Sequence, residues 1–96
     1  MYCKEHIYGH STILACCDKE HLGKTFKDGK IEFTAKESFY KGKEVTEEEF
    51  VQLLEESESV NLFGEKAVKI VLAKGLANEK SVIKINGIPH LQIYRL

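Results

Sequence analysis

The segment NLFGEKAVKIVLAKG, residues 61–75, contains the most apolar helical pattern in this chain of 96 residues. It predicts a helix from Leu62 to Lys74, in which two lysines and an alanine share the one side that is not strongly apolar. Gly75 follows where a left-handed residue ends a helix, and Leu76 is expected to pack back against Val71. A helix that is apolar on most sides must be buried, so we expect it at the centre of the core.

A second, acidic helix is predicted upstream of this segment. Thr46 and Glu49 have the spacing of a capping box, in which each side chain bonds the backbone N–H of the other residue. Val45 and Phe50 occupy the two positions of a hydrophobic staple around this cap. The glutamates of the first turn also lie at the positive end of the helix dipole, where negative charge is favourable.

Strands are expected on both sides of the two helices. The predicted strands cover Met1–Tyr8, Thr12–Cys17, Lys30–Thr34, Ser81–Ile85 and Ile88–Leu96. Asn86-Gly87 predicts a hairpin between the last two, because a type I′ turn needs positive φ at both central residues. The order of elements predicts one α+β domain over residues 1–96, with a small mixed or antiparallel sheet whose N-terminal and C-terminal hairpins pack on two helices.

The composition excludes several classes of protein. Its hydrophobic fraction of 43% and charged fraction of 30% are those of a globular chain. No apolar run approaches the roughly 18 to 20 residues that cross a bilayer, and the first residues lack the pattern of a secretory signal. We therefore expect a cytoplasmic protein without a membrane partner, whose three cysteines are reduced and serve as small hydrophobic side chains.

Charge is unevenly distributed along the chain, although the net charge is only −1. Residues 24–43 include six lysines, whereas residues 44–58 include seven glutamates and no basic residue. The small net charge argues against a protein that binds nucleic acid through bulk electrostatics. A patchy surface can steer a partner, but the alternative is that both charge runs are merely solvated faces.

The last predicted strand carries a row of hydrogen-bonding side chains. Strand alternation directs Leu91 and Ile93 toward the core and places His90, Gln92 and Tyr94 together on the opposite face. Such a face can stack on and hydrogen-bond to a nucleotide, or receive a peptide. The alternative is an ordinary solvated face of a sheet.

Aromatic and basic residues are interleaved in a predicted turn near residue 40. This candidate binding region comprises Phe39, Tyr40, Lys41 and Lys43, and we add Lys24 from the same lysine-rich stretch. Aromatic rings among cationic side chains are suited to stacking an unpaired base. The alternative is that Phe39 fills the core.

Cys17, Asp18 and His21 form a candidate metal or nucleophile cluster. Thiol, carboxylate and imidazole groups bind zinc, and a thiol beside an imidazole base can act as a nucleophile. Asp18 and His21 share one face if the chain makes a helical turn here. The second ligand pair of a structural zinc site is missing, however, so the alternative is that Asp18 caps this turn and His21 lies at the surface.

Four stretches together resemble the archaeal family catalogued as domain of unknown function 424. They are Cys17-Asp18 with Leu22-Gly23-Lys24, Ser38-Phe39-Tyr40-Lys41-Gly42, Asn61-Leu62-Phe63-Gly64-Glu65-Lys66-Ala67-Val68, and Ile85-Asn86-Gly87-Ile88-Pro89-His90-Leu91-Gln92. The stretches occur in order over nearly the whole chain. The resemblance implies an archaeal cytosolic protein and supplies no activity, cofactor or catalytic residue.

The sequence therefore favours a non-catalytic binding module over an enzyme. Its lysine-rich segments with interleaved aromatic residues point to RNA, a translation-related ribonucleoprotein or a protein as the partner. We expect no cofactor and name no catalytic residue. The alternative is a small metal-binding protein or cysteine-dependent enzyme centred on Cys17, Asp18 and His21.

Overall fold

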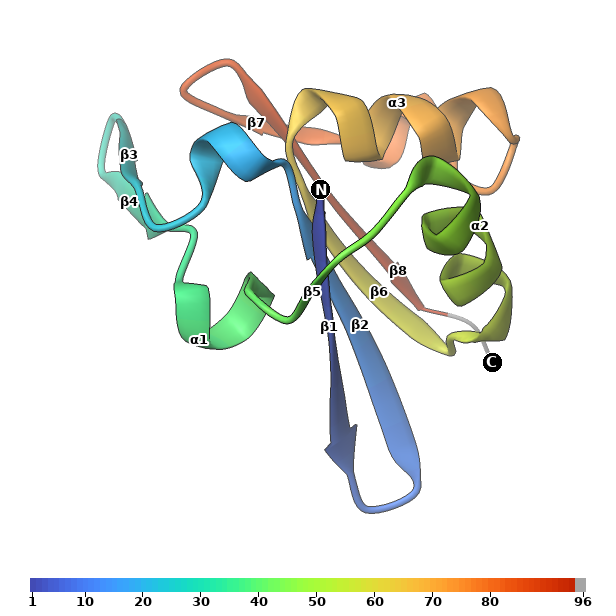
Figure 1. Ribbon diagram of the computed structural model, residues 1–96. Coiled ribbons are helices and arrows are strands. Elements are labelled where there is room, and N and C mark those ends of the chain that lie inside the picture. The colour runs from blue at the N-terminus through green and yellow to red at the C-terminus, as the bar shows by residue number, and fades with distance from the viewer. Residues whose placement is uncertain (95–96) are drawn as a thin grey trace.

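The computed structural model describes residues 1–94 as a six-stranded mixed sheet, a separate two-stranded hairpin and three α-helices (Figure 1). The strands are β1 (Tyr2–Tyr8), β2 (Ser11–Cys17), β3 (Thr25–Asp28), β4 (Ile31–Thr34), β5 (Lys43–Glu44), β6 (Ser59–Phe63), β7 (Ile83–Ile85) and β8 (Ile88–Tyr94). The helices are α1 (Glu37–Tyr40), α2 (Glu47–Glu56) and α3 (Glu65–Ala73). The predicted α+β class is confirmed, while the predicted end of the last strand, residues 95–96, lies outside the described residues.

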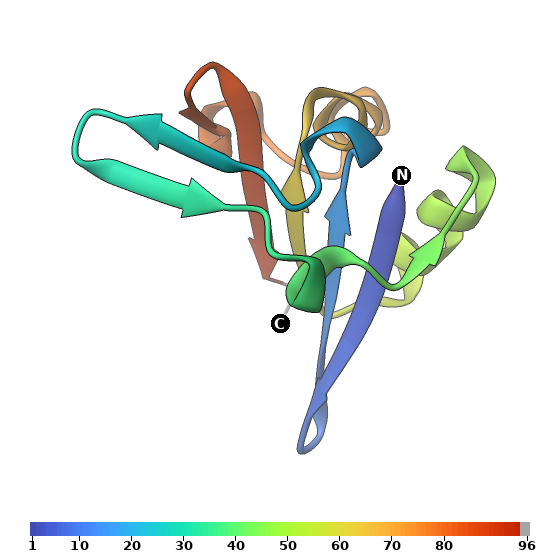
Figure 2. The ribbon, with the colours of Figure 1, turned by 60° about the vertical axis from the view of Figure 1, so that its left-hand side comes forward.

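The large sheet has the strand order β5-β1-β2-β6-β8-β7. The predicted N-terminal and C-terminal hairpins are its β1–β2 and β7–β8 pairs, and both are antiparallel. They are joined through β6, which pairs in parallel with β2 and antiparallel with β8. The β1–β2 hairpin extends well beyond the rest of the molecule in both views (Figures 1 and 2).

Each face of the sheet has its own apolar core. The first core joins the sheet to α2 and α3, and it contains Leu14, Phe50, Leu62, Val71 and Leu91. The second core joins the opposite face to α1 and the β3–β4 hairpin, and this hairpin lies across the sheet from α2 and α3 (Figure 2). Its buried members include Ala15, Cys17, Tyr40, Phe63 and Ile88. The apolar run at residues 12–17 therefore belongs to a strand that is covered on both faces.

The predicted helix from Leu62 to Lys74 is wrong at its start. Leu62 and Phe63 belong to β6 and point into the first and second cores respectively. Gly64, with φ 129° and ψ 153°, separates the strand from α3. The helix is half-buried, because α3 covers only one face of the sheet.

Most of the local signals are confirmed. Thr46 and Glu49 form the capping box of α2, and Asn86-Gly87 has the two positive φ angles of the predicted turn. Gly75 has φ 69°, and the backbone N–H of Leu76 donates to the carbonyl of Val71 at 3.1 Å. Among residues 1–94, no helix is long and apolar enough to span a membrane.

Candidate functional site

His90, Gln92 and Tyr94 share one face of β8, as predicted, and form a chain of contacts. The Tyr94 hydroxyl donates to Gln92 Oε1 at 2.6 Å, and Gln92 Nε2 lies 3.4 Å from His90 Nε2. His90 Nδ1 lies 2.9 Å from the carbonyl oxygen of Leu62. These contacts are all satisfied when Gln92 donates to Nε2 and the Nδ1–H of His90 donates to Leu62, so the chain favours the Nδ1–H tautomer.

The two ends of this face differ in exposure. His90 is buried, and its ring centroid lies 5.6 Å from that of Phe33 on β4 and 6.2 Å from that of Phe63 on β6. Gln92 is exposed, and Tyr94 is 72% exposed. The β3–β4 hairpin therefore covers the His90 end of β8 and leaves the Tyr94 end uncovered.

The uncovered region extends across four strands. Register pairing places four residues side by side, namely His6, Ile13, Ser59 and Tyr94 on β1, β2, β6 and β8. Directly paired residues point to the same face of a sheet, and these four side chains are half-buried or exposed. We call this set the open row. It presents imidazole, aliphatic, hydroxyl and phenol groups on a rigid support.

Nearly parallel rings lie beside His6, a member of the open row. The rings of Phe39 and His6 are 4.7 Å apart between centroids and 17° from parallel. The rings of His6 and Tyr8 are 6.3 Å apart and 11° from parallel. His6 Nε2 lies 2.8 Å from the carbonyl oxygen of Phe39, which fixes the imidazole, while Tyr8 is 58% exposed. His6 is thus occupied by contacts within the protein, and the exposed ring of Tyr8 is the member of this stack on which a flat ligand such as an unpaired base could stack.

Tyr40 does not take part in the binding region predicted around it. Its side chain is buried in the second core, and its hydroxyl donates to Asn61 Oδ1 at 2.6 Å. Burial raises the pKa of Tyr40. The prediction that Tyr40 stacks on a ligand is wrong, because this ring fills the core, while the half-buried Phe39 lies beside His6.

The three lysines of the predicted region have different surroundings. Lys41 Nζ lies 4.0 Å from Glu37 Oε1 within α1, and Lys43 Nζ lies 3.5 Å from Glu49 Oε2 on α2. Lys24 precedes β3 and is exposed. Lys43 therefore contacts the helical side of the sheet, whereas α1 and β3 belong to the opposite side.

The charges differ between the two sides of the sheet. Residues 24–41 cover the second core and contain five lysines against three acidic residues. Helix α2 covers the first core and contains five glutamates without a basic residue. The open row therefore lies on the side with the lysine-rich segment and faces away from the acidic helix.

Asp18 holds the start of α3 rather than its own helical turn. Its Oδ2 accepts from the backbone N–H of Lys66 at 2.8 Å, and its Oδ1 accepts from that of Ala67 at 3.0 Å. The turn that follows Asp18, at Lys19–His21, receives no side-chain bond from it. Burial raises the pKa of the Asp18 carboxyl group, and the two amide bonds oppose that shift. The prediction that Asp18 caps its own turn is wrong, because the free amides of α3 lie within its reach.

Glu65, rather than the predicted Cys17, joins Asp18 and His21 as the third potential metal ligand. Ligand atoms of Asp18, His21 and Glu65 lie within 4.8 Å of one another, a spacing that could hold a metal ion. His21 Nε2 lies 2.7 Å from Glu65 Oε1, and this hydrogen bond lowers the pKa of Glu65. The imidazole is half-buried, with its ring edge-on to Phe26 and Phe63, so it is not the free surface residue expected as the alternative.

Cys17 is unsuited to the chemistry proposed for it. Its side chain is fully buried in the second core, and its thiol donates to the carbonyl oxygen of Asp18 at 3.3 Å. Burial raises the pKa of Cys17 to about 12. A thiol with such a pKa is protonated at neutral pH, whereas nucleophilic attack and metal binding require the thiolate.

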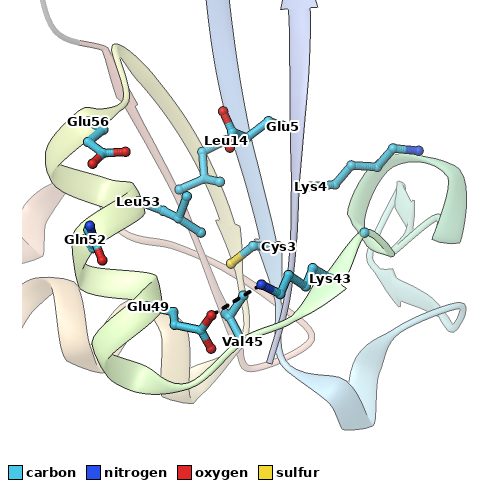
Figure 3. Close-up of a pocket in the computed structure, with 11 residues that line it drawn as sticks. Cys3, Lys4, Glu5, Leu14, Lys43, Val45, Glu49, Gln52, Leu53 and Glu56 are labelled. Atoms are coloured by element: carbon cyan, nitrogen blue, oxygen red, sulfur yellow. Dashed lines mark ion pairs between the residues drawn. The ribbon is translucent and has the colours of Figure 1, made fainter.

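A groove of about 510 Å³ lies on the helical side of the sheet, between α2 and β1 (Figure 3). Its apolar floor is formed by Cys3, Leu14, Val45 and Leu53, and acidic residues of both elements lie around it. In the close-up, Leu14 and Leu53 approach each other across the groove, while Lys4 points away from it (Figure 3). Sequence reasoning did not find this groove, because it depends on how α2 lies against β1.

Other site residues were also missed from the sequence. His6 and Ile13 join Tyr94 only through strand register, and Glu65 joins His21 only through the packing of α3. One sequence signal pointed to the contact at the start of α3. Gly64 precedes an apolar helix, and the free backbone amides at such a helix start can bind an anion. The anion in this structure is the carboxylate of Asp18.

Comparisons with known proteins agree with the resemblance seen in the sequence. A solved structure titled as an uncharacterized conserved protein from Methanopyrus kandleri is similar to this chain, with a TM-score of 0.82 and 30% sequence identity. The match covers 99% of this chain and 90% of that one. No curated protein matches the sequence. Residues 5–96 match the family described as protein of unknown function (DUF424), and the chain belongs to that family.

Proposed function

We propose that this protein is a non-catalytic RNA-binding module that holds a single-stranded segment, alone or within a ribonucleoprotein, on the open row. The observation that carries the proposal is the alignment of His6, Ile13, Ser59 and Tyr94 across the uncovered part of one sheet. Sequence-specific RNA recognition usually targets unpaired bases, which stack on aromatic side chains and hydrogen-bond at their edges. The open row and its flanking rings offer both kinds of contact.

The neighbouring residues support this assignment. Tyr8 and Tyr94 are exposed at opposite ends of the region, on β1 and β8, so two bases could stack on separate rings. Gln92 lies beside Tyr94 and is exposed, with an amide that can read a base edge. The lysines of residues 24–41 lie on the same side of the sheet and suit a phosphate backbone.

Fluorescence anisotropy with a labelled single-stranded RNA of mixed sequence tests the proposal. Tyr94→Ala and Tyr8→Ala are each expected to weaken binding by about fivefold or more, since one base stacked on an aromatic ring contributes about 1 to 3 kcal/mol. Ile7→Ala is the matched control, because Ile7 adjoins Tyr8, is 74% exposed and points to the opposite face. Equal losses in all three variants, or no binding at low salt, would refute the assignment.

A second candidate function, divalent metal binding, rests on the convergence of Asp18, His21 and Glu65. Carboxylate and imidazole groups suit zinc, although both Asp18 oxygens already accept amide bonds. Zinc titration of protein prepared without an affinity tag tests it, with thermal unfolding as the readout. Stabilisation that disappears in His21→Ala and Glu65→Gln would support a metal site, and equal stabilisation of all variants would contradict it.

A further inference from the structure

The groove between α2 and β1 combines an apolar floor with two carboxylates that have no partner among the described residues 1–94. Glu5 and Glu56 line it, and within residues 1–94 neither forms an ion pair or side-chain hydrogen bond. Glu49 also lines the groove and is paired with Lys43 (Figure 3). The arrangement suits a long cationic side chain, whose methylene stem packs on apolar surface while its charged end meets a carboxylate.

The edge of the sheet beside this groove is unpaired over most of its length. β5 pairs with β1 only at Tyr2 and Cys3, and Gly42 packs against Lys4. The described residues 1–94 offer no strand to the outer edge of β1 from Glu5 to Tyr8. Such an edge presents backbone N–H and C=O groups to which an extended peptide can add. Every second side chain of an added strand would then point toward the groove side of the sheet.

Side chains on the helical face of β1 continue the groove along this strand. Cys3 and Glu5 line the groove, and Ile7, two residues further on, is 74% exposed. Alternation places all three on one face of β1. An occupant can therefore contact an apolar side chain at Ile7, a carboxylate at Glu5 and the apolar floor at Leu14.

We propose that this groove and the free edge of β1 together bind an extended, arginine-bearing segment of a protein partner. The backbone of the segment pairs with β1, and its arginine side chains lie in the groove against Leu53 and reach Glu5 and Glu56. The five glutamates of α2 add a negative field that favours the same partner. This surface lies on the opposite side of the sheet from the open row, so the protein can hold an RNA strand and a basic peptide at once.

The test is a titration of ¹⁵N-labelled protein, followed by NMR, with a capped heptapeptide of alternating threonine and arginine. We expect amide shifts in β1 from Glu5 to Tyr8 and along α2, and none from the same peptide carrying glutamate in place of arginine. Prolines at two consecutive central positions of the arginine peptide should abolish binding, because one of any two neighbouring residues in an added strand directs its backbone N–H toward β1, and proline has none.

Two double variants of equal charge change separate the groove from the general field of α2. Glu5→Gln with Glu56→Gln should weaken peptide binding by about fivefold, whereas Glu48→Gln with Glu55→Gln, outside the groove, should leave it within about twofold. Ile7→Ala should weaken peptide binding and spare RNA binding, and Tyr8→Ala should do the reverse.

Several results would overturn the proposal. These are shifts confined to the open row, equal losses in the two double variants, or no binding at millimolar peptide. Self-association through this edge would also overturn it, and sedimentation of the free protein would show this as a dimer in the absence of peptide. RNA binding is measured in a separate experiment and on the opposite face of the sheet. A negative result with the peptide therefore does not contradict the proposed RNA binding.

Discussion

The carboxylate of Asp18 occupies the space that a side chain at Gly64 would need. A Cβ atom placed on Gly64 would lie 2.6 Å from Asp18 Cβ and 2.7 Å from its Oδ1. Gly64 also has φ 129°, a backbone angle that residues other than glycine rarely adopt. The absence of a side chain at Gly64 thus lets Asp18 reach the first free amides of α3, 48 and 49 residues further along the chain.

Gly64→Ala is expected to lower the free energy of unfolding by about 2 kcal/mol or more, because it adds backbone strain and displaces the cap of α3. Urea denaturation at neutral pH measures the loss. Gly9→Ala is the control for left-handed strain without a clash, since Gly9 has φ 62° and a Cβ there would meet nothing within 4 Å, and its loss should be smaller. Equal losses at both positions would show that strain alone matters and that Asp18 does not need the space.

Substitution of Asp18 tests the cap directly. Asp18→Ala leaves the backbone N–H groups of Lys66 and Ala67 without their acceptors, and it should cost about 1 to 3 kcal/mol. Asp18→Asn keeps one acceptor oxygen and should lose less. In Asp18→Ala, the amides in the first turn of α3 should exchange hydrogen faster than in the wild type. The amides of α2, whose capping box is untouched, should not change. Unchanged exchange at Lys66 and Ala67 would contradict this role.

The pH dependence of stability should report the contact between His21 and Glu65. Because the hydrogen bond to His21 lowers the pKa of Glu65 below its ordinary value of 4.5, ionised Glu65 stabilises the folded state above that pH. That contribution is lost as the pH falls through the lowered pKa. Since Glu65 is exposed, we expect the free energy of unfolding of the wild type to exceed that of Glu65→Gln by only about 0.5 kcal/mol at pH 7. This difference should disappear toward pH 3. If the difference in urea midpoint between wild type and Glu65→Gln is the same at pH 7 and pH 3, the expectation is contradicted.

The cysteines should be unreactive in the folded protein. Cys3, Cys16 and Cys17 are all buried, and burial raises the pKa of Cys16 and Cys17, the latter to about 12. At pH 8, a thiol-specific disulfide reagent should therefore modify Cys16 and Cys17 only after unfolding in guanidinium chloride. Mass spectrometry of the digested protein assigns the sites. Rapid modification of Cys17 in the native protein would contradict this expectation and support a nucleophilic role for Cys17.

The sequence by itself determined the elements whose hydrogen bonds are local. Thr46 and Glu49 are three residues apart, Gly75 lies two residues after the end of α3, and Asn86-Gly87 joins two adjacent strands, so neighbouring residues specify each structure. The shared face of His90, Gln92 and Tyr94 likewise follows from strand alternation alone.

Only the tertiary structure decided the contacts that join distant segments. Leu62 and Phe63 fit a helical pattern equally well, but they became a strand because β2 and β8 supply partners for their backbone on both sides. Tyr40 entered the core because Asn61 lies where its hydroxyl needs an acceptor. Asp18 capped α3 rather than its own turn, and the open row and the groove exist only where β1, β2, β6, β8 and α2 meet. Short-range patterns do not encode these sites, because each depends on burial and hydrogen bonds between residues far apart in the chain.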